Sequence, residues 1–306
     1  MSATLPAARH GDRKDHVDGR AVALLLGCCA VWGLGQVAAK LTLSEIPPLL
    51  QAAMRSLGAG MLLLAWSGWR GLQLWRADGT GRAGLLAGAL FAIEFGCIFV
   101  GLQFTAASRM IVFIYLAPFV VALGMPFISH SERLRPLQMA GLAAAFAGVV
   151  WAFFEGFERP AAGPLQWLGD ALGIAGAVLW GLTTLVLRRS RLSSAAPEKT
   201  LLWQLLVSGL ALALGSFVAG ERLVAMPTAA SLWPLAFQTV VVTFASYLVW
   251  FWLIRHYPAT RLASFTMLTP VFGLLAGALL LGEPVTARLL VALVAVAGGI
   301  VLVNRP

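Results

Sequence analysis

The sequence predicts an all-α membrane protein whose ten transmembrane helices form two inverted five-helix repeats around a central cavity. The chain of 306 residues is 59% hydrophobic and only 11% charged, with a mean hydropathy of +0.85, well above the usual range of soluble domains. One segment of the chain occurs twice, and each copy has a proline near the middle of an apolar run. Because five spans per half is an odd number, the second half must be inverted relative to the first.

The duplicated segment is residues 107–118, ASRMIVFIYLAP, which returns as residues 259–270, ATRLASFTMLTP, at an offset of 152 residues. Its prolines, Pro118 and Pro270, each remove a helix hydrogen bond and clash with the preceding turn. In lipid such a break persists only where protein or a cavity satisfies the freed backbone groups. We therefore expect two broken helices facing one cavity, with Pro118 and Pro270 as hinges. A pair of fixed kinks is the alternative.

The ten spans follow from apolar runs that are long enough to cross about 30 Å of hydrocarbon. They lie at residues 21–43, 47–69, 82–105, 109–128, 136–154, 168–188, 200–219, 233–254, 260–281 and 286–303. The chain is accordingly divided into a basic cytoplasmic tail at 1–20, a first repeat at 21–154, an external connecting loop at 155–167, a second repeat at 168–303 and a cytoplasmic end at 304–306.

The distribution of basic residues predicts the orientation. With the N-terminus inside, sixteen of the 22 Lys and Arg residues fall in inside segments and four in outside loops, as the positive-inside rule requires. We expect a multi-pass protein of the bacterial inner membrane with both termini in the cytoplasm. The formal charge of +9 is explained by this topology, so the lipid bilayer and a small-molecule substrate are the expected partners, and nucleic acid is not.

Glu94 is the sharpest single signal, because it lies in the middle of the third span, where an ionised carboxylate is costly. It should face the protein interior. Arg55 in the second span is predicted at a similar depth, at about 1.5 Å per helical residue. Two readings stay open: a structural ion pair between Glu94 and Arg55, or a carboxylate on the transport path that binds a cationic group or a proton.

The eighth span has the most amphipathic pattern. Thr239, Thr243, Ser246, Tyr247 and Trp250 follow the i, i+4, i+7, i+8 and i+11 spacing of one helix face. Hydroxyl groups that bond back to their own helix are the alternative, but that would not place all five on one face. The pattern predicts that Ser246, Tyr247 and Trp250 line the cavity.

The first and sixth spans carry matching polar and aromatic residues. Trp32 and Gln36 lie one helical turn apart in the first span, and Trp180 and Thr184 take the same places in the sixth. Both tryptophans lie deeper than the interface belt where tryptophan is usually an anchor. Tyr115 adds a polar aromatic group within one turn of the first proline. We predict that all five side chains bind substrate.

The sequence gives no sign of a metal site or a nucleotide-binding site in the membrane, and it leaves the oligomeric state open. The four histidines lie in the tail or at span ends, so no metal site is expected in the membrane, and no Gly-rich phosphate loop indicates a cofactor or ATP. Stripes of small residues in spans five and ten allow close helix packing within one subunit or in a homodimer. They are Gly141, Ala145, Gly148, Ala292, Ala295 and Gly299.

The chain resembles the drug/metabolite transporter superfamily over residues 21–303, and more narrowly the ten-helix EamA-type exporters. The resemblance is carried by a Trp-Gly pair at 32–33 and again at 180–181, by the two mid-span prolines, and by the Ala147-Gly148 and Gly298-Gly299 endings of spans five and ten. It implies an inverted-repeat bundle with a central cavity formed by spans 1, 3, 4, 6, 8 and 9. The aromatic residues are similar to those of the aromatic amino-acid exporters of this group.

Our leading hypothesis is export of small amphipathic metabolites, aromatic and other neutral amino acids above all, by alternating access without ATP. Aromatic rings suit aromatic or ammonium-bearing solutes, and Gln36, Thr184, Ser246 and Glu94 would hold the polar end. Efflux of lipophilic or quaternary-ammonium drugs, with Glu94 as counter-charge, is the alternative. A membrane enzyme or scaffold is a third reading, which lacks a nucleophile and base at one depth.

Overall fold

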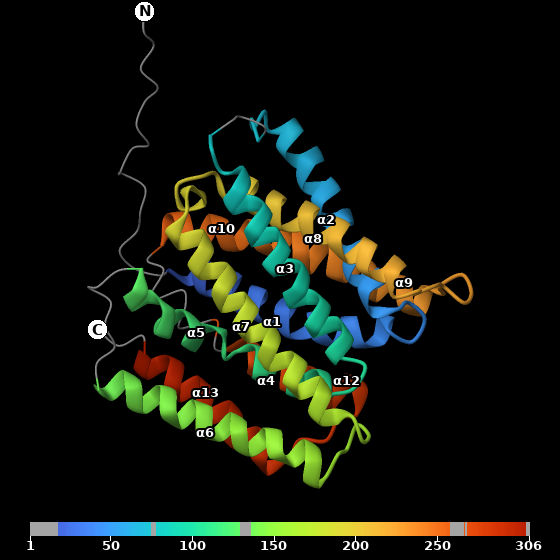
Figure 1. The fold of residues 1–306 in the computed structure, drawn as a ribbon, viewed down its shortest axis with the longest axis vertical. Helices are drawn as coiled ribbons and strands as arrows, with labels where there is room; N and C mark the ends of the chain where they lie inside the picture. Colours follow the sequence, from blue (N-terminus) through green and yellow to red (C-terminus); the bar gives the residue numbers. More distant parts are fainter. Residues whose placement is uncertain (1–17, 75–77, 129–135, 258–265, 267, 304–306) are drawn as a thin grey trace, which may run out of the picture.

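The computed structural model describes residues 18–74, 78–128, 136–257, 266 and 268–303, and all regular structure in these ranges is helical (Figure 1). Its elements are α1 (Gly19–Thr42), α2 (Pro48–Trp69), α3 (Gly81–Gly101), α4 (Ala107–Ile114), α5 (Ala117–Gly124), η2 (Met125–Phe127), α6 (Pro136–Glu158), α7 (Gln166–Arg189), η3 (Arg191–Ser193), α8 (Pro197–Val218), α9 (Ala229–Ala236), η4 (Phe237–Ala245), α10 (Ser246–His256), α12 (Leu268–Leu281) and α13 (Ala287–Val303).

These elements confirm the predicted membrane architecture. Within the described residues, eight helical segments are long and apolar enough to cross a membrane, counting 107–127 and 229–250 as one segment each. The shorter apolar helices α12 and α13 complete the ten. The predicted tail and C-terminal end lie largely outside the described residues.

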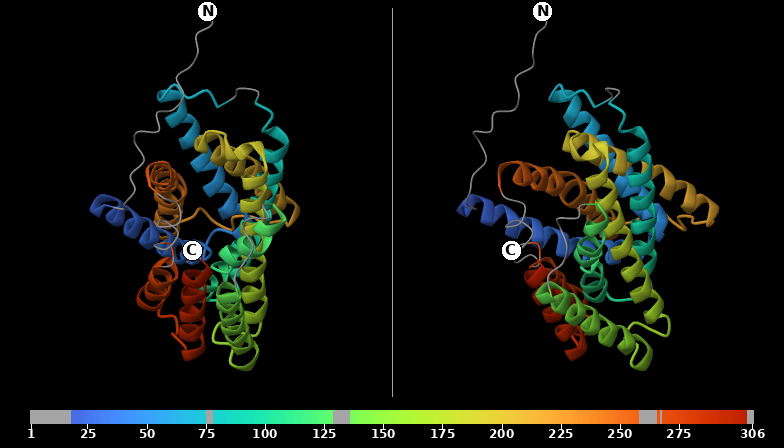
Figure 2. Two further views of the ribbon diagram at one scale, coloured as in Figure 1. Left: turned by 90° about the vertical axis from the view of Figure 1, so that its left-hand side faces the viewer. Right: turned by 60° about the vertical axis from the view of Figure 1, so that its left-hand side comes forward.

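The second five helices repeat the packing of the first in inverted form. α3 packs on α7, while α1, the counterpart of α7, packs on α9 and η4, the counterparts of α3. The counterparts α2 and α8 pack on each other, and so do α6 and α13, which run side by side in every view (Figures 1 and 2). Helices that are one repeat apart in the sequence therefore make equivalent contacts in the structure.

The Trp-Gly pairs mark two equivalent helix crossings. A methyl group on Gly33 in α1 would lie 2.6 Å from the backbone nitrogen of Gly273 and 2.9 Å from the carbonyl carbon of Phe272 in α12. A methyl group on Gly181 in α7 would lie 2.5 Å from Cβ of Val120 in α5. Since Val120 and Phe272 are one repeat apart, each glycine lets its helix approach the same part of a broken helix.

We expect Gly33→Ala to lower the melting temperature of the detergent-solubilised protein. The added methyl group meets backbone, which cannot rotate aside, and overpacking of this kind costs about 1–3 kcal/mol. Gly27→Ala on the same helix is the matched control, because nothing lies within 4 Å of its added methyl group. The control should leave the melting temperature unchanged or raise it slightly, since alanine favours helix. Equal melting curves for both variants would contradict this view of the crossing.

The fourth span is broken where its proline predicts. α4 ends at Ile114, Tyr115 and Leu116 interrupt the helix, and α5 begins at Ala117. Pro118 thus lies in the first turn of α5, where its missing N–H would have had no helical partner. In the second copy Pro270 is the third residue of α12, and residues 258–265 and 267 before it lie outside the described range. The predicted break is confirmed for the first copy.

Two polar tethers join the halves of the chain at opposite ends of the bundle, in repeat-related positions. Thr228 donates to Glu45 from its backbone nitrogen and its hydroxyl, both at 2.6 Å, and these bonds lower the pKa of the Glu45 carboxyl. Lys199 Nζ lies 2.7 Å from Asp78 Oδ2, and the hydrogen bond to Lys199 lowers the pKa of Asp78. Glu45, Thr228 and Asp78 lie in loops and Lys199 lies in the first turn of α8, so each tether joins one half of the chain to the other.

The small-residue stripes pack on one another within the chain. A methyl group on Gly299 would lie 2.6 Å from the carbonyl oxygen of Gly141, and one on Gly148 would lie 2.8 Å from Cβ of Ala295. Ala145 and Ala292 are fully buried between α6 and α13. The reading of these stripes as packing within one subunit is confirmed, and a homodimer through another surface stays a prediction.

Candidate functional site

Glu94 and Arg55 are both buried in the middle of the bundle, at 3% and 5% exposure. The ion pair between them, one of the two predictions from the sequence, does not form in the structure. Oε2 of Glu94 and both Nε and Nη2 of Arg55 have no hydrogen-bond partner. The Arg55 guanidinium lies instead over two rings of α3, with Cζ 3.9 Å from the centre of Phe95 and 5.1 Å from that of Phe99. The guanidinium and the carboxyl are near each other, and each keeps buried polar atoms without a partner.

The aromatic residue of the first span meets the eighth span. Trp32 Nε1 donates to Oγ of Ser246 at 2.8 Å, and the Ser246 hydroxyl donates in turn to the carbonyl of Val242 at 2.5 Å. The rings of Trp32 and Trp250 meet edge to face, with centres 5.4 Å apart. The structure therefore brings together Trp32, Ser246 and Trp250 from α1 and α10.

The equivalent tryptophan of the sixth span meets the break in the fourth. Trp180 and Tyr115 form an edge-to-face pair with ring centres 6.0 Å apart. Tyr115 lies at the C-terminal end of α4, where the helix is interrupted, so the break itself presents this ring. Tyr115 is buried, whereas Trp180 is 36% exposed. Each repeat thus places the tryptophan of its Trp-Gly pair against an aromatic ring of another helix.

Tyr247 of α10 belongs to the same part of the interior as Arg55 and Glu94. It packs against the apolar core that contains Phe95 and Phe99, and it interacts electrostatically with Arg55, Glu94 and Tyr115. The predicted residues Glu94, Tyr115 and Tyr247 therefore belong to one region of the interior.

Gln36 and Thr184 are not joined to these groups. Oε1 of Gln36 is buried without a hydrogen-bond partner. The Thr184 hydroxyl donates to the carbonyl of Trp180, one turn earlier in its own helix, at 3.0 Å. In this structure Thr184 follows the back-bonding pattern of a helical threonine.

The single polar face predicted for the eighth span is wrong in its first half. Residues 237–245 form the π-helix η4, in which hydrogen bonds link i and i+5, so side chains four residues apart no longer align. The methyl group of Thr239 packs over Gly58 of α2, whereas Ser246 contacts α1. Thr243 is fully buried and its hydroxyl has no partner.

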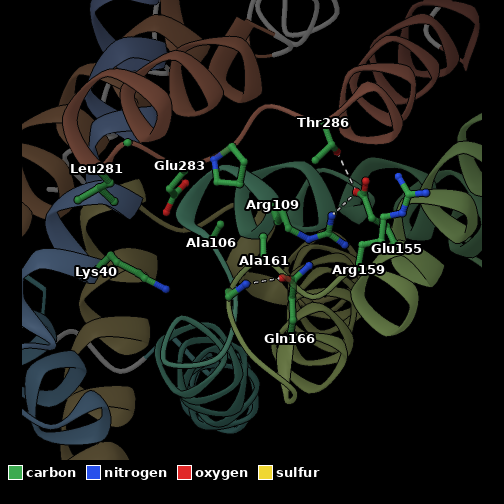
Figure 3. Close-up of a pocket in the computed structure, with 13 residues that line it drawn as sticks. Lys40, Ala106, Arg109, Glu155, Arg159, Ala161, Gln166, Leu281, Glu283 and Thr286 are labelled. Atoms are coloured by element: carbon green, nitrogen blue, oxygen red, sulfur yellow. Dashed lines mark hydrogen bonds and ion pairs between the residues drawn. The ribbon is translucent and has the colours of Figure 1, made fainter.

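A charged network lies near a cavity of about 350 Å³ at the predicted outer end (Figure 3). Arg109 of α4 donates to Asp170 of α7 at 2.5 Å and to Glu155 of α6 at 2.9 Å. Thr105 donates to Asp170 at 2.5 Å, and Thr286 donates to Glu155 at 2.8 Å. Figure 3 shows Arg109 and Thr286 converging on Glu155. The network joins α4, α6 and α7 to the start of α13.

The sequence does not predict this network, partly because the apolar run of the fifth span ends at residue 154. α6 continues to Glu158, which places Glu155 inside a helix. The repeat offset is the signal that could have found the rest, since it relates Asp170 to Asp18 and Thr105 to Tyr257. Tyr257 donates its hydroxyl to Asp18 at 3.0 Å, as Thr105 does to Asp170. Among the described residues no group of three potential metal ligands occurs.

Known proteins share this architecture along nearly the whole chain. A Bacillus subtilis (strain 168) protein named uncharacterized transporter YvbV is 28% identical over 292 residues, which cover 93% of this chain and 92% of that protein. A Salmonella typhimurium (strain LT2) protein named probable amino-acid metabolite efflux pump is 30% identical over 287 residues, covering 90% and 92%. One crystal structure aligns with a TM-score of 0.66 at 19% identity, over 92% of this chain and 96% of the chain in that structure. This match shows that the two proteins share a fold.

The match to a described family covers the two repeats separately. The EamA-like transporter family matches residues 19–154 and again residues 167–305. These ranges are the two halves that the offset of 152 residues and the equivalent helix crossings define. The chain therefore belongs to the EamA-like transporter family, within the drug/metabolite transporter superfamily, and is a multi-pass membrane transporter.

Proposed function

We propose that the protein exports small amphipathic metabolites, aromatic and other neutral amino acids above all, across the bacterial inner membrane. Export proceeds by alternating access without ATP, with both termini in the cytoplasm. The observation that carries the proposal is the set of aromatic pairs between helices, Trp32 with Trp250 and Tyr115 with Trp180, contributed by both repeats. Rings of this kind stack on apolar side chains and attract ammonium groups. The name of the Salmonella relative supports the same substrate class.

The polar end of the substrate would be held by Glu94, Ser246 and Gln36. Glu94 and Gln36 each have a buried oxygen without a partner, and a substrate ammonium group would satisfy them. Ser246 already accepts from Trp32, so it would position that ring as well as contact substrate. Thr184 would join the site only by turning its hydroxyl away from the Trp180 carbonyl.

Efflux of lipophilic or quaternary-ammonium cations is the second candidate, favoured by the unpartnered carboxyl of Glu94. Counterflow in proteoliposomes separates the two functions, with labelled phenylalanine in one arm and a quaternary-ammonium dye in the other. We expect phenylalanine to be taken up and the dye to be excluded. The same vesicles with and without a pH gradient reveal proton coupling. Vesicles that move neither solute would contradict both functions and favour an enzyme or scaffold.

We predict that Pro118→Ala and Pro270→Ala trap opposite states if both prolines are hinges. A hinge at one depth in each inverted repeat opens one side while the other closes. The measurement is labelling of single cysteines at Ala162, beside the outer cavity, and at Ser190, at the other end of α7, after removal of the free cysteines Cys28, Cys29 and Cys97.

Labelling should rise at one end in the first variant and at the other end in the second. Pro136→Ala, at the first residue of α6, is the control and should change neither. Parallel shifts in the two variants, or no shift, would show that the prolines are fixed kinks.

A further inference from the structure

Arg55 differs from the other buried charged side chains of the described chain. Arg109, Asp170 and Glu155 form one ion-paired group, and Lys199 pairs with Asp78. Only Arg55 and Glu94 are buried without an ion-pair partner in this part of the chain. Because arginine stays protonated in proteins, its buried charge cannot be removed by losing a proton. The fold satisfies the other buried charges and leaves these two for another molecule.

The unsatisfied atoms of Arg55 have the geometry of a carboxylate site. Nε and Nη2 are the two atoms without an acceptor, and their N–H groups point from the same edge of the guanidinium plane. That edge binds both oxygens of a carboxylate in two parallel hydrogen bonds. The rings of Phe95 and Phe99 hold the guanidinium by cation–π contact, which leaves its edge free to donate.

The neighbouring carboxyl of Glu94 needs a hydrogen-bond donor, where Arg55 needs an acceptor. Glu94 precedes Phe95 in α3, and Arg55 lies over the Phe95 ring, so the carboxyl and the guanidinium are neighbours although the two side chains form no ion pair. A monocation bound at Glu94 would leave Arg55 unsatisfied, and an anion at Arg55 would leave Glu94 unsatisfied. A molecule with an ammonium and a carboxylate on one carbon would satisfy both, and the complex would carry no net charge.

We infer that Arg55 binds the carboxylate of the substrate while Glu94 binds its ammonium group, so that the transporter selects zwitterionic α-amino acids over amines and acids. This inference rests on the proposed export of amino acids. It adds Arg55, on α2, to the substrate-binding residues. The apolar side chain of the substrate would then face Tyr247 and the aromatic pairs.

Three related solutes test the inference in proteoliposomes: phenylalanine, phenethylamine, which lacks the carboxylate, and 3-phenylpropionate, which lacks the ammonium group. Wild-type protein should move phenylalanine at least about tenfold faster than either analogue, since a charge-assisted hydrogen bond is worth a factor of about ten or more. Arg55→Gln should lose about tenfold or more on phenylalanine and keep phenethylamine flux within about twofold. Arg55→Lys keeps the charge but not the two parallel N–H groups. Its phenylalanine flux should therefore lie between that of the wild type and that of Arg55→Gln.

Arg70→Gln, at the exposed end of the same helix, is the control and should keep the wild-type order of the three solutes. A uniform loss on all three solutes in Arg55→Gln, or no loss, would overturn the inference and leave amino-acid export standing. If Arg55→Gln does not fold, an unchanged order of solutes in Arg55→Lys overturns it equally. Wild-type protein that moves none of the three would refute the proposed function, and this inference with it.

Discussion

Replacing Glu94 with glutamine should reduce phenylalanine flux by about tenfold or more while the protein folds as before. The substitution keeps the size of the side chain and removes the charge that we propose for the ammonium group of the substrate. A charged acceptor is worth about 1.5–3 kcal/mol more than none, which is a factor of ten or more in rate or affinity. Glutamine can still accept one hydrogen bond, so some flux should remain.

The stability of the variant separates this role from a structural one. If Glu94 neutralised Arg55 in an ion pair, its removal would leave a buried arginine alone at a cost of about 3–5 kcal/mol. In the structure the two form no ion pair, and Oε2 of Glu94 already has no partner. The melting temperature should therefore stay the same or rise, because an unsatisfied buried carboxyl is itself unfavourable.

Counterflow and thermal unfolding of the same preparation measure both quantities. Glu158→Gln is the control, since Glu158 is exposed and pairs with Arg288 at the end of α6; it should change neither. A lower melting temperature together with lower flux would assign Glu94 to structure. Normal flux with an unchanged melting temperature would remove Glu94 from both roles.

The elements of the fold could be predicted because their signals are local or repeated. An apolar run of sufficient length is enough to predict a membrane span, and a duplicated segment adds the relation between the halves. The break after Ile114 followed from Pro118 alone, as proline excludes the backbone donor that a continuous helix needs. The odd number of spans per half then required inversion.

The rotation of each helix about its axis could not be predicted in the same way. Arg55 and Glu94 were placed at a similar depth by counting residues, yet depth does not say which way a side chain points. Packing of Arg55 on Phe95 and Phe99 turns the guanidinium away from an ion pair with Glu94. The π-helix η4 has a similar effect, because it shifts Thr239 onto α2, and a pattern counted with 3.6 residues per turn cannot contain it.

The charged network at the predicted outer end was missed for a different reason. Its members lie far apart in sequence, and each has an ordinary explanation when taken alone, as a loop arginine or a helix-end acid. Asp170 is 61 residues from Arg109 and fully buried. Comparing the two repeats position by position would have paired Asp170 with Asp18 and exposed the pattern.

Arg109→Gln should destabilise the protein more than any other single substitution considered for this chain. The guanidinium of Arg109 binds Asp170 through Nε and Nη2, Glu155 through Nη1, and the carbonyl of Ala152 through Nη2. Without it, the carboxylates of Asp170 and Glu155 would remain buried with no cation between them. Leaving a buried charge unpaired costs about 3–5 kcal/mol, which is a large part of the stability of an ordinary domain.

The partners of Arg109 make the cause of that loss testable by thermal unfolding. Arg109→Lys should recover part of the melting temperature, because it restores the charge but cannot reach both carboxylates. Adding Asp170→Asn to Arg109→Gln should also recover part of it, since the second substitution removes one of the stranded charges. Arg288→Gln is the control, because the carboxylate of its partner Glu158 is 55% exposed and ion pairs of exposed groups contribute little. If Arg109→Gln melted like wild type, or if Asp170→Asn made it worse, the network would not hold α4, α6 and α7 together.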